Sequence, residues 1–192
     1  MRTFAVVGHL ARTDDTFPLE DLPGSAGRMD LLCRCVRASL FLSHGLRRDA
    51  ECRLLLLGPP DPPRIIRFIG GRVRSLSPDE RSAGSLIKRA LSIPAGDLYR
   101  ESTPGVEVRR GTLQDMMDGG PWAVLDENGR DIRKAEHFGD HFLLSDHRDF
   151  TADEEALLTG FPRYSVGPRP LHADDAISVV QNELDRREGG WS

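Results

Sequence analysis

The sequence has few cysteines and no long apolar run. Cys33, Cys35 and Cys52 are the only cysteines among 192 residues, and no two of them form a CxxC pair. That number and spacing exclude a disulfide framework and a cysteine zinc site, so we expect three small buried side chains. No stretch approaches the roughly 20 apolar residues of a membrane-spanning helix, and the N-terminus lacks the apolar region and cleavage site of a secretory signal. The sequence therefore predicts a cytoplasmic protein without a membrane segment.

Lysine is almost absent, since Lys88 and Lys134 are the only lysines among 26 basic residues. A formal net charge of −4 excludes a chain that is basic all over. The abundant arginines nevertheless have planar guanidinium groups that hold phosphates and stack on bases. An acidic chain of this kind can bind RNA if its arginines gather on one face. A high-salt or GC-rich source and plain codon bias explain the composition equally well.

Common catalytic and nucleotide-binding motifs are missing as well. The sequence has no P-loop, no GxGxxG after a strand, no GxSxG and no HExxH. His137 and His141 lie four residues apart, but Gly139 between them argues against a helix, and no thiolate or carboxylate cluster completes a ligand set. We therefore expect neither a metal site nor a conventional dinucleotide site.

What the sequence does have is an alternation of strand and helix patterns along its whole length. We predict strands at residues 4–8, 53–57, 65–69, 106–110, 122–125, 142–144 and 164–166, and helices at 28–43, from 77 to about 94, at 112–118, from 151 and at 172–187. Strands separated by helices indicate right-handed crossovers and a mostly parallel sheet flanked by helices. We expect one α/β domain over residues 1–192.

Two local patterns sharpen this prediction. The run Ser77-Pro78-Asp79-Glu80 is typical of a capping box, with Ser77 as the N-cap residue of the following helix. The run Asp126-Glu127-Asn128-Gly129 is typical of a turn that ends the strand at residues 122–125.

Three predicted loops leave the carboxyl ends of strands, at residues 125–129, 144–148 and 166–171. Open α/β sheets bind their ligands at this edge, although ordinary turns give the same pattern. The third loop is rich in proline and opens onto a helix N-terminus at His172, so its free backbone groups can contact the edge of an adenine ring. Polar residues also start the first predicted helix. Arg28, Asp30 and Arg34 there belong either to a functional site or to a solvated helix cap.

Several segments together resemble one known family. They are residues 22–35, 41–44 with 47–49, 77–81, 102–105 with 108–110, 146–147, and a last segment made of Pro168, 171–173, Ile177, Asn182 and 184–185. They occur in order over nearly the whole chain. The sequence is thus similar to the archaeal tRNA pseudouridine-54 N1-methyltransferases of the SPOUT superfamily.

The resemblance implies a SPOUT fold with a C-terminal trefoil knot at about residues 120–188, S-adenosylmethionine (SAM) as the cofactor, tRNA as the substrate, and a homodimer with its site between the subunits. By position, the implied cofactor contacts are Leu125, Ser145, Val166, Gly167, Pro168, Arg169, Pro170, Leu171 and Ala176. Relatives often have Gly at the position of Ser145, Ser at that of Gly167 and Cys at that of Ala176. Backbone contacts would survive these changes, but a side-chain contact at Ala176 would not.

The implied reaction is methylation of N1 of pseudouridine, which needs no metal because the sulfonium methyl is already electrophilic. We expect Asp30 or Asp79 to accept the N1 proton. We expect contacts with the base and phosphates from the following arginines: Arg28, Arg34, Arg81 and Arg109. The alternatives are a SPOUT methyltransferase that acts on another RNA site, such as a ribosomal pseudouridine, and a non-catalytic RNA-binding protein with the same fold.

Overall fold

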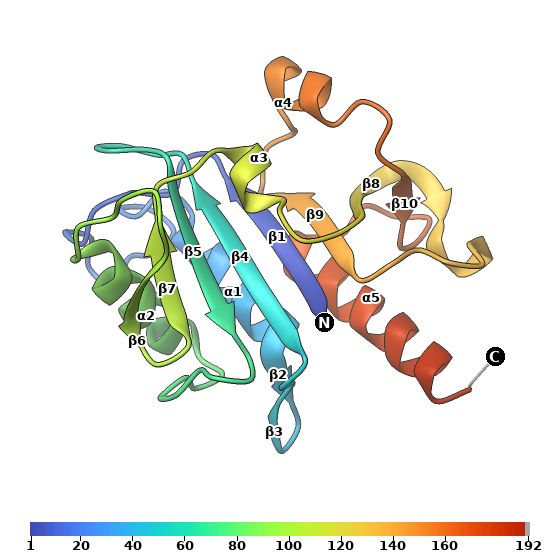
Figure 1. Cartoon of the computed structure of the whole chain (residues 1–192), viewed down its shortest axis with the longest axis horizontal. Helices are drawn as coiled ribbons and strands as arrows, with labels where there is room; N and C mark the ends of the chain where they lie inside the picture. The colour runs from blue at the N-terminus through green and yellow to red at the C-terminus, as the bar shows by residue number, and fades with distance from the viewer. Residues whose placement is uncertain (191–192) are drawn as a thin grey trace.

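The computed structural model describes residues 1–190, and a single eight-stranded sheet runs through it (Figure 1). In spatial order the strands are β10 (Arg163–Ser165), β8 (Trp122–Asp131), β9 (His141–Ser145), β1 (Arg2–Gly8), β4 (Ala50–Leu56), β5 (Arg64–Ile69), β7 (Val106–Arg109) and β6 (Arg100–Thr103). The half from β10 to β4 is parallel, and the half from β4 to β6 is antiparallel. The predicted α/β class is confirmed, with a mixed sheet that is parallel where the three loops lie.

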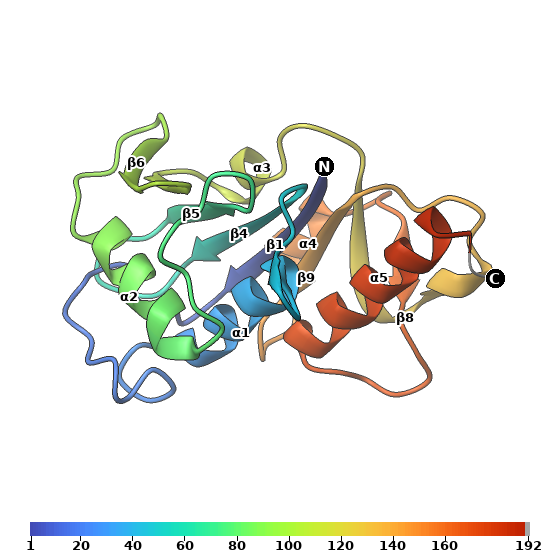
Figure 2. The same ribbon diagram turned by 90° about the horizontal axis from the view of Figure 1, so that it is seen from below.

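Helices of unequal length cover the two faces of the sheet. The long helices on one face are α1 (Met29–Leu40), α2 (Glu80–Leu91) and α5 (Ala173–Glu188), whereas the other face carries the short helices α3 (Leu113–Met116) and α4 (Ala152–Leu157) (Figure 2). Strand alternation divides the core accordingly. On β1, Phe4 and Val6 join the cluster beneath the long helices, and Ala5 and Val7 join the other one.

The first helix is shorter than predicted. It ends at Leu40, and the chain then forms a small hairpin of β2 (Phe41–Leu42) and β3 (Gly45–Leu46), which the sequence prediction missed together with β6. All three cysteines are free and buried, as expected. Among the described residues no helix is both long and apolar enough to span a membrane.

Two predicted element ends are wrong. The N-cap residue of α2 is Asp79, not Ser77, because the Asp79 side chain accepts the Ser82 N–H at 2.9 Å, while the Ser82 hydroxyl is occupied by the backbone N–H of Ser77. The turn predicted at residues 126–129 lies within β8 instead. That strand continues because Tyr164 and Ser165 of β10 pair with its last two residues, after a shift in register.

Candidate active site

A cavity of about 540 Å³ lies where residues 125–128 of β8 meet the segments that follow β9 and β10. Of the predicted cofactor contacts, the cavity is lined by Leu125, Ser145, Val166, Arg169, Pro170, Leu171 and Ala176. Gly167 and Pro168 belong to the same loop but do not line the cavity. Parallel strands end at a common edge, which is why segments far apart in the sequence converge here.

The lining of this cavity suits a ligand with both an apolar ring and charged groups. Leu144 and Leu125 provide apolar surface, whereas Arg163 donates to Asp126 at 2.6 Å and forms an ion pair with Glu155 at 2.5 Å. Burial raises the pKa of Asp126, but hydrogen bonds from the Asn128 N–H and from Arg163 outweigh this effect and lower it overall. The volume lies in the usual range for small-molecule and cofactor sites. These residues therefore fit an adenosyl group that carries an amino acid.

A histidine that the sequence analysis did not single out supports one wall of the cavity. His9 follows β1 directly, and its ring nitrogens lie 3.0 Å from an Asp146 oxygen and 3.0 Å from a Glu154 oxygen. The Asp146 hydrogen bond is the main reason that the pKa of His9 is raised, against the opposing effect of burial. Because Val7 of β1 is paired with Ser145 of β9, the strand pattern could have placed His9 near Asp146. Nothing in the sequence pointed to Glu154.

Three of the predicted substrate-side residues come together at the start of α1. Arg28 donates two hydrogen bonds to the buried Asp30 at 2.9 and 3.0 Å, and Arg34 donates a third at 3.0 Å. Arg34 also contacts Glu80 at 3.1 Å and Asp174 at 3.4 Å. Asp174 lies next to Ala173, which lines the cavity, and Arg28 interacts electrostatically with Asp146 of the cavity wall. None of the three residues lines the cavity itself, and Arg34 and Asp174 line a second groove; the group is linked to the cavity through Asp174 and Asp146.

The other predicted residues lie outside this group. Asp79 is exposed, and its carboxylate caps α2. Arg81 forms an exposed ion pair with Glu20 at 3.1 Å. Arg109 lies on the opposite face of the sheet, stacked at 4.8 Å on Tyr99, which packs with the core of that face.

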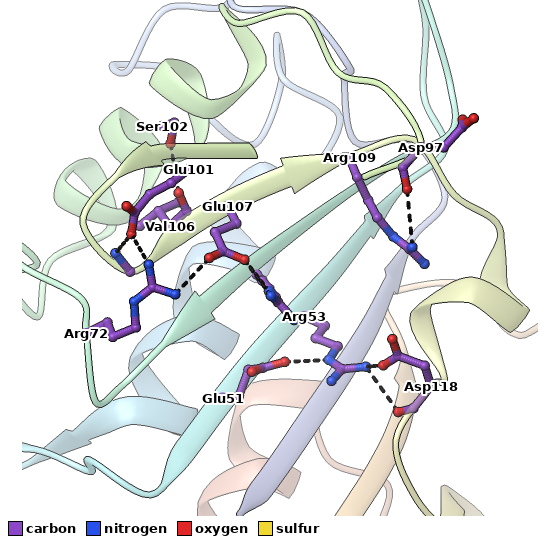
Figure 3. Close-up of polar contacts among 12 residues, drawn as sticks. Glu51, Arg53, Arg72, Asp97, Glu101, Ser102, Val106, Glu107, Arg109 and Asp118 are labelled. Atoms are coloured by element: carbon purple, nitrogen blue, oxygen red, sulfur yellow. Dashed lines mark hydrogen bonds and ion pairs between the residues drawn. The ribbon is translucent and has the colours of Figure 1, made fainter. Parts of the chain in front are cut away.

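Figure 3 shows Arg109 near a network of charged side chains on that opposite face. Arg53 of the central strand β4 is buried and bonded to Glu51 at 2.5 Å and to Asp118. Next to it, Glu107 joins Arg67 and Arg72, at 2.6 and 2.9 Å. A strand is predicted at residues 53–57, but nothing in its sequence pattern revealed this network. Its charges are already paired, which is typical of a structural role.

Comparisons with known proteins agree with this geometry. Residues 1–189 match the model of a family of SAM-dependent RNA methyltransferases. The tRNA (pseudouridine(54)-N(1))-methyltransferase of Methanospirillum hungatei is 58% identical over the full length of both chains. The protein of the same name from Halobacterium salinarum is 44% identical over 96% of each chain. A crystal structure of Archaeoglobus fulgidus Nep1 bound to S-adenosylhomocysteine has a TM-score of 0.64 over 98% of this chain and 100% of that one, at 20% identity, which shows a common fold.

The sheet, the cavity at its edge and the full-length family match define a SAM-dependent RNA methyltransferase. Within that class, the chain belongs to the tRNA (pseudouridine(54)-N(1))-methyltransferase family. The family predicted from the sequence is thereby confirmed.

Proposed function

We propose that this protein transfers a methyl group from SAM to N1 of pseudouridine 54 in tRNA. The observation that carries the proposal is the cavity lined by most of the predicted cofactor contacts, in a chain that is 58% identical, over its full length, to a protein named for this activity. SAM supplies an electrophilic methyl group on its sulfonium. The protein must then hold N1 at about 3 Å from that methyl, in line with the leaving sulfur.

The choice of atom follows from the chemistry of the base. Pseudouridine is joined to ribose through carbon, so its N1 still carries a hydrogen and has a position open for the methyl. N1 of uridine is bonded to ribose and cannot be methylated in the same way. The reaction therefore requires that a pseudouridine synthase has acted first.

Of the two carboxylates considered, we propose Asp30 as the acceptor of the N1 proton. It is buried between Arg28 and Arg34, which lie near the cavity wall, whereas Asp79 is exposed and engaged in capping α2. Burial raises the pKa of Asp30, but hydrogen bonds from Arg28 and Arg34 outweigh this and lower it overall, so the group is ionised at neutral pH. N1 becomes strongly acidic as its bond to the methyl forms, and a carboxylate with a low pKa suffices to take its proton.

The arginines that hold Asp30 gain a role from the same arrangement. We propose that Arg28 and Arg34 steady the charge that spreads onto the ring oxygens and contact the neighbouring phosphate. Arg81 and Arg109 lie away from them, so we propose these two only as contacts for more distant parts of the tRNA.

Asp30→Asn tests this assignment. We expect methyl transfer to be abolished while SAM binding, measured by calorimetry, stays intact. Asp79→Asn is the matched control and should retain most of the transfer activity. Near-normal turnover by the Asp30 variant would remove Asp30 from the mechanism, and inactivity of the Asp79 variant with an unchanged melting temperature would favour Asp79.

The function as a whole is tested by transfer of labelled methyl to tRNA with and without prior pseudouridylation. We expect label only on the pseudouridylated tRNA. Mass spectrometry of tRNA from a deletion strain gives the complementary result, which is loss of N1-methylpseudouridine. Label on ribosomal RNA instead would favour another target, and a protein that fails to bind SAM would favour a non-catalytic RNA-binding protein.

We also propose that the enzyme is a homodimer with its site between the subunits. A second groove, of about 830 Å³, runs beside the N-terminus of α5 and is lined in part by Phe41, Leu42 and Arg37. Leu42 is 49% exposed, which is unusual for a large apolar side chain beside a groove. Light scattering should give twice the 21.3 kDa of one chain, and Leu42→Asp should lower that mass.

The remaining expectations concern the chain path and the compartment. We propose that residues 1–192 are one domain whose segment at about 120–188 is threaded as a trefoil knot. The position of β8 between β9 and β10 supports this, because the chain must return past β8 after leaving β9. Mechanical stretching tests it: a knotted chain stops short of the contour length of its residues at about 3.3–3.6 Å each, and an unknotted one reaches it. We propose the cytoplasm as the compartment, where three reduced cysteines are stable.

A further inference from the structure

We propose that His9, as an imidazolium ion, is a positioning residue that fastens the loop of residues 144–148 to α4, and that cofactor binding weakens when this proton is lost. The inference rests on the proposed function in one respect, namely that the cavity binds SAM. His9 does not line the cavity. It acts through Asp146, which does.

The hydrogen bonds around His9 require a proton on each ring nitrogen. Nδ1 lies 3.0 Å from Oδ1 of Asp146, and Nε2 lies 3.0 Å from Oε2 of Glu154. A carboxylate can only accept, and a neutral imidazole has a single N–H. In the neutral form, one nitrogen lone pair would face a carboxylate oxygen. The imidazolium form alone satisfies both contacts.

We call the group formed by His9, Asp146 and Glu154 the clasp. It is well shielded from solvent. The side chains of His9, Asp146 and Glu154 are 7%, 2% and 11% exposed. Backbone contacts hold the same partners in place: the His9 N–H donates to Asp146 at 2.9 Å, and the Thr151 N–H donates to Glu154 at 2.8 Å. Charge-assisted hydrogen bonds in such a setting are stronger than exposed ones.

The charged groups near the clasp come from each element that packs against it. Asp146 and His147 follow β9, Glu154 lies on α4, and Arg28 at the start of α1 interacts with Asp146. The hydrogen bond to Asp146 is the leading cause that raises the pKa of His9, burial opposes it, and Glu154 raises it further. A raised pKa means that the clasp persists to a higher pH than the titration of an ordinary histidine would allow. It is lost as the pH rises through the pKa of His9 in the folded protein.

Opening the clasp alters the cavity because Asp146 organises the loop around it. Oδ1 of Asp146 accepts the Arg148 N–H at 3.0 Å, and Arg148, Ser145 and His147 all line the cavity. If the loop holds its binding conformation for only a fraction of the time, the apparent affinity for SAM falls by that fraction. A loop fastened for one tenth of the time would bind SAM about tenfold more weakly.

The first measurement is the affinity for SAM by calorimetry at several pH values, for the wild type and for His9→Gln. We expect His9→Gln to bind about tenfold more weakly at pH values below the titration of His9. Because titration of SAM itself is common to both proteins, the quantity to follow is the ratio of the two affinities. That ratio should fall towards one as the pH rises through the titration of His9. His44→Gln, which changes an exposed histidine of the β2–β3 hairpin, is the matched control and should bind as the wild type does.

The second measurement is the titration of the histidine ring by NMR, with the His9 signal assigned by its absence in His9→Gln. Glu154→Gln keeps an acceptor for Nε2 but removes a charge, so we expect the His9 titration to move to lower pH by about one unit or more. The decline in SAM affinity should move with it. A residue with only a packing role would show no such joint shift.

The outcomes separate the two proposals. A wild-type protein that binds no SAM at any pH overturns the proposed function and this inference with it. A protein that binds SAM, but whose His9→Gln variant keeps wild-type affinity throughout, overturns this inference alone. The same holds if Glu154→Gln leaves the His9 titration in place.

Discussion

Asp185 joins the C-terminal half of α5 to two other parts of the molecule, and its replacement by asparagine gives a measurable test of the fold. It accepts a hydrogen bond from Arg2 at 2.6 Å and two from Arg47 at 2.8 and 2.6 Å. Arg2 starts β1, and Arg47 follows β3. The other end of α5 contributes Ala173 and Ala176 to the cofactor cavity, so this anchor affects the helix that borders the site.

The expected loss lies between the values for exposed and buried ion pairs. An exposed pair contributes about 0–1 kcal/mol, and removal of one partner of a buried pair costs about 3–5 kcal/mol. Asp185 is 40% exposed, but Arg2 and Arg47 are only 3% and 12% exposed. Arg2 also keeps a hydrogen bond to Gln181 and an ion pair with Glu188. We therefore expect Asp185→Asn to lower the free energy of unfolding by about 2 kcal/mol and Tm by about 4–8 °C.

The pH dependence provides a second, independent check. Burial raises the pKa of Asp185, but the hydrogen bonds from Arg47 and Arg2 outweigh it and lower the pKa overall. A carboxyl group with a lowered pKa contributes its stability above the ordinary carboxyl pKa of about 3.9 and loses it as the pH falls through the folded-state value. The difference between wild type and variant should therefore be constant near neutrality and disappear in acid.

Urea unfolding followed by circular dichroism at neutral and acidic pH measures both effects. Asp97→Asn, in the exposed loop before β6, is the matched control and should change stability by less than about 0.5 kcal/mol. An Asp185 variant that is as stable as this control at neutral pH would show that the ion pairs of Asp185 do not stabilise the fold. An equal loss in acid and at neutrality would refute the reasoning as well.

Two further predictions concern the core. Gly27→Ala should lower the free energy of unfolding by more than about 2 kcal/mol. The reason is that Gly27 has a φ of 66° and that a Cβ there would lie 1.8 Å from the carbonyl oxygen of Leu10. Gly45→Ala, whose Cβ would meet no atom within 4 Å, is its control in the same urea assay, and equal losses would contradict the argument. The three cysteines should react slowly with a thiol reagent in the native protein and fully after unfolding, since burial raises the pKa of each thiol. A rapid reaction of the native protein would show instead that the thiols are accessible.

The features that could be predicted from the sequence are those set by local periodicity or by sheet geometry. The strand patterns placed three segments near one edge of the sheet, and those segments line one cavity, although residues 125–128 lie within β8 rather than in a loop. Asp30 and Arg34 lie four residues apart on one helix, so their meeting needed only the helical period, and Arg28 reaches Asp30 from the N-cap position of the same helix. No long-range packing had to be known in either case.

The features that could not be predicted depend on how distant elements pack. The strand β8 extends to Asp131 only because β10 pairs with its end, which a turn-like sequence does not reveal. Arg109 was grouped with Arg28, although β7 places it on the opposite face of the sheet from α1. His9 and Glu154 meet across 145 residues, and their contact depends on where the short helix α4 docks.

That short helix connects two walls of the cavity through neighbouring residues. Glu154 binds His9, which holds the loop that contains Asp146, while Glu155 binds Arg163, which in turn holds Asp126 at 2.6 Å. Arg163 and Glu155 are more exposed than His9 and Asp146, and salt screens exposed charges more than buried ones. Ionic strength should therefore loosen the wall that contains Asp126 before it loosens the wall that contains Asp146. Proton concentration should act mainly on the second wall, since the histidine lies there. The two walls of one cofactor cavity thus respond to different properties of the solution, although a single helix of six residues supports both.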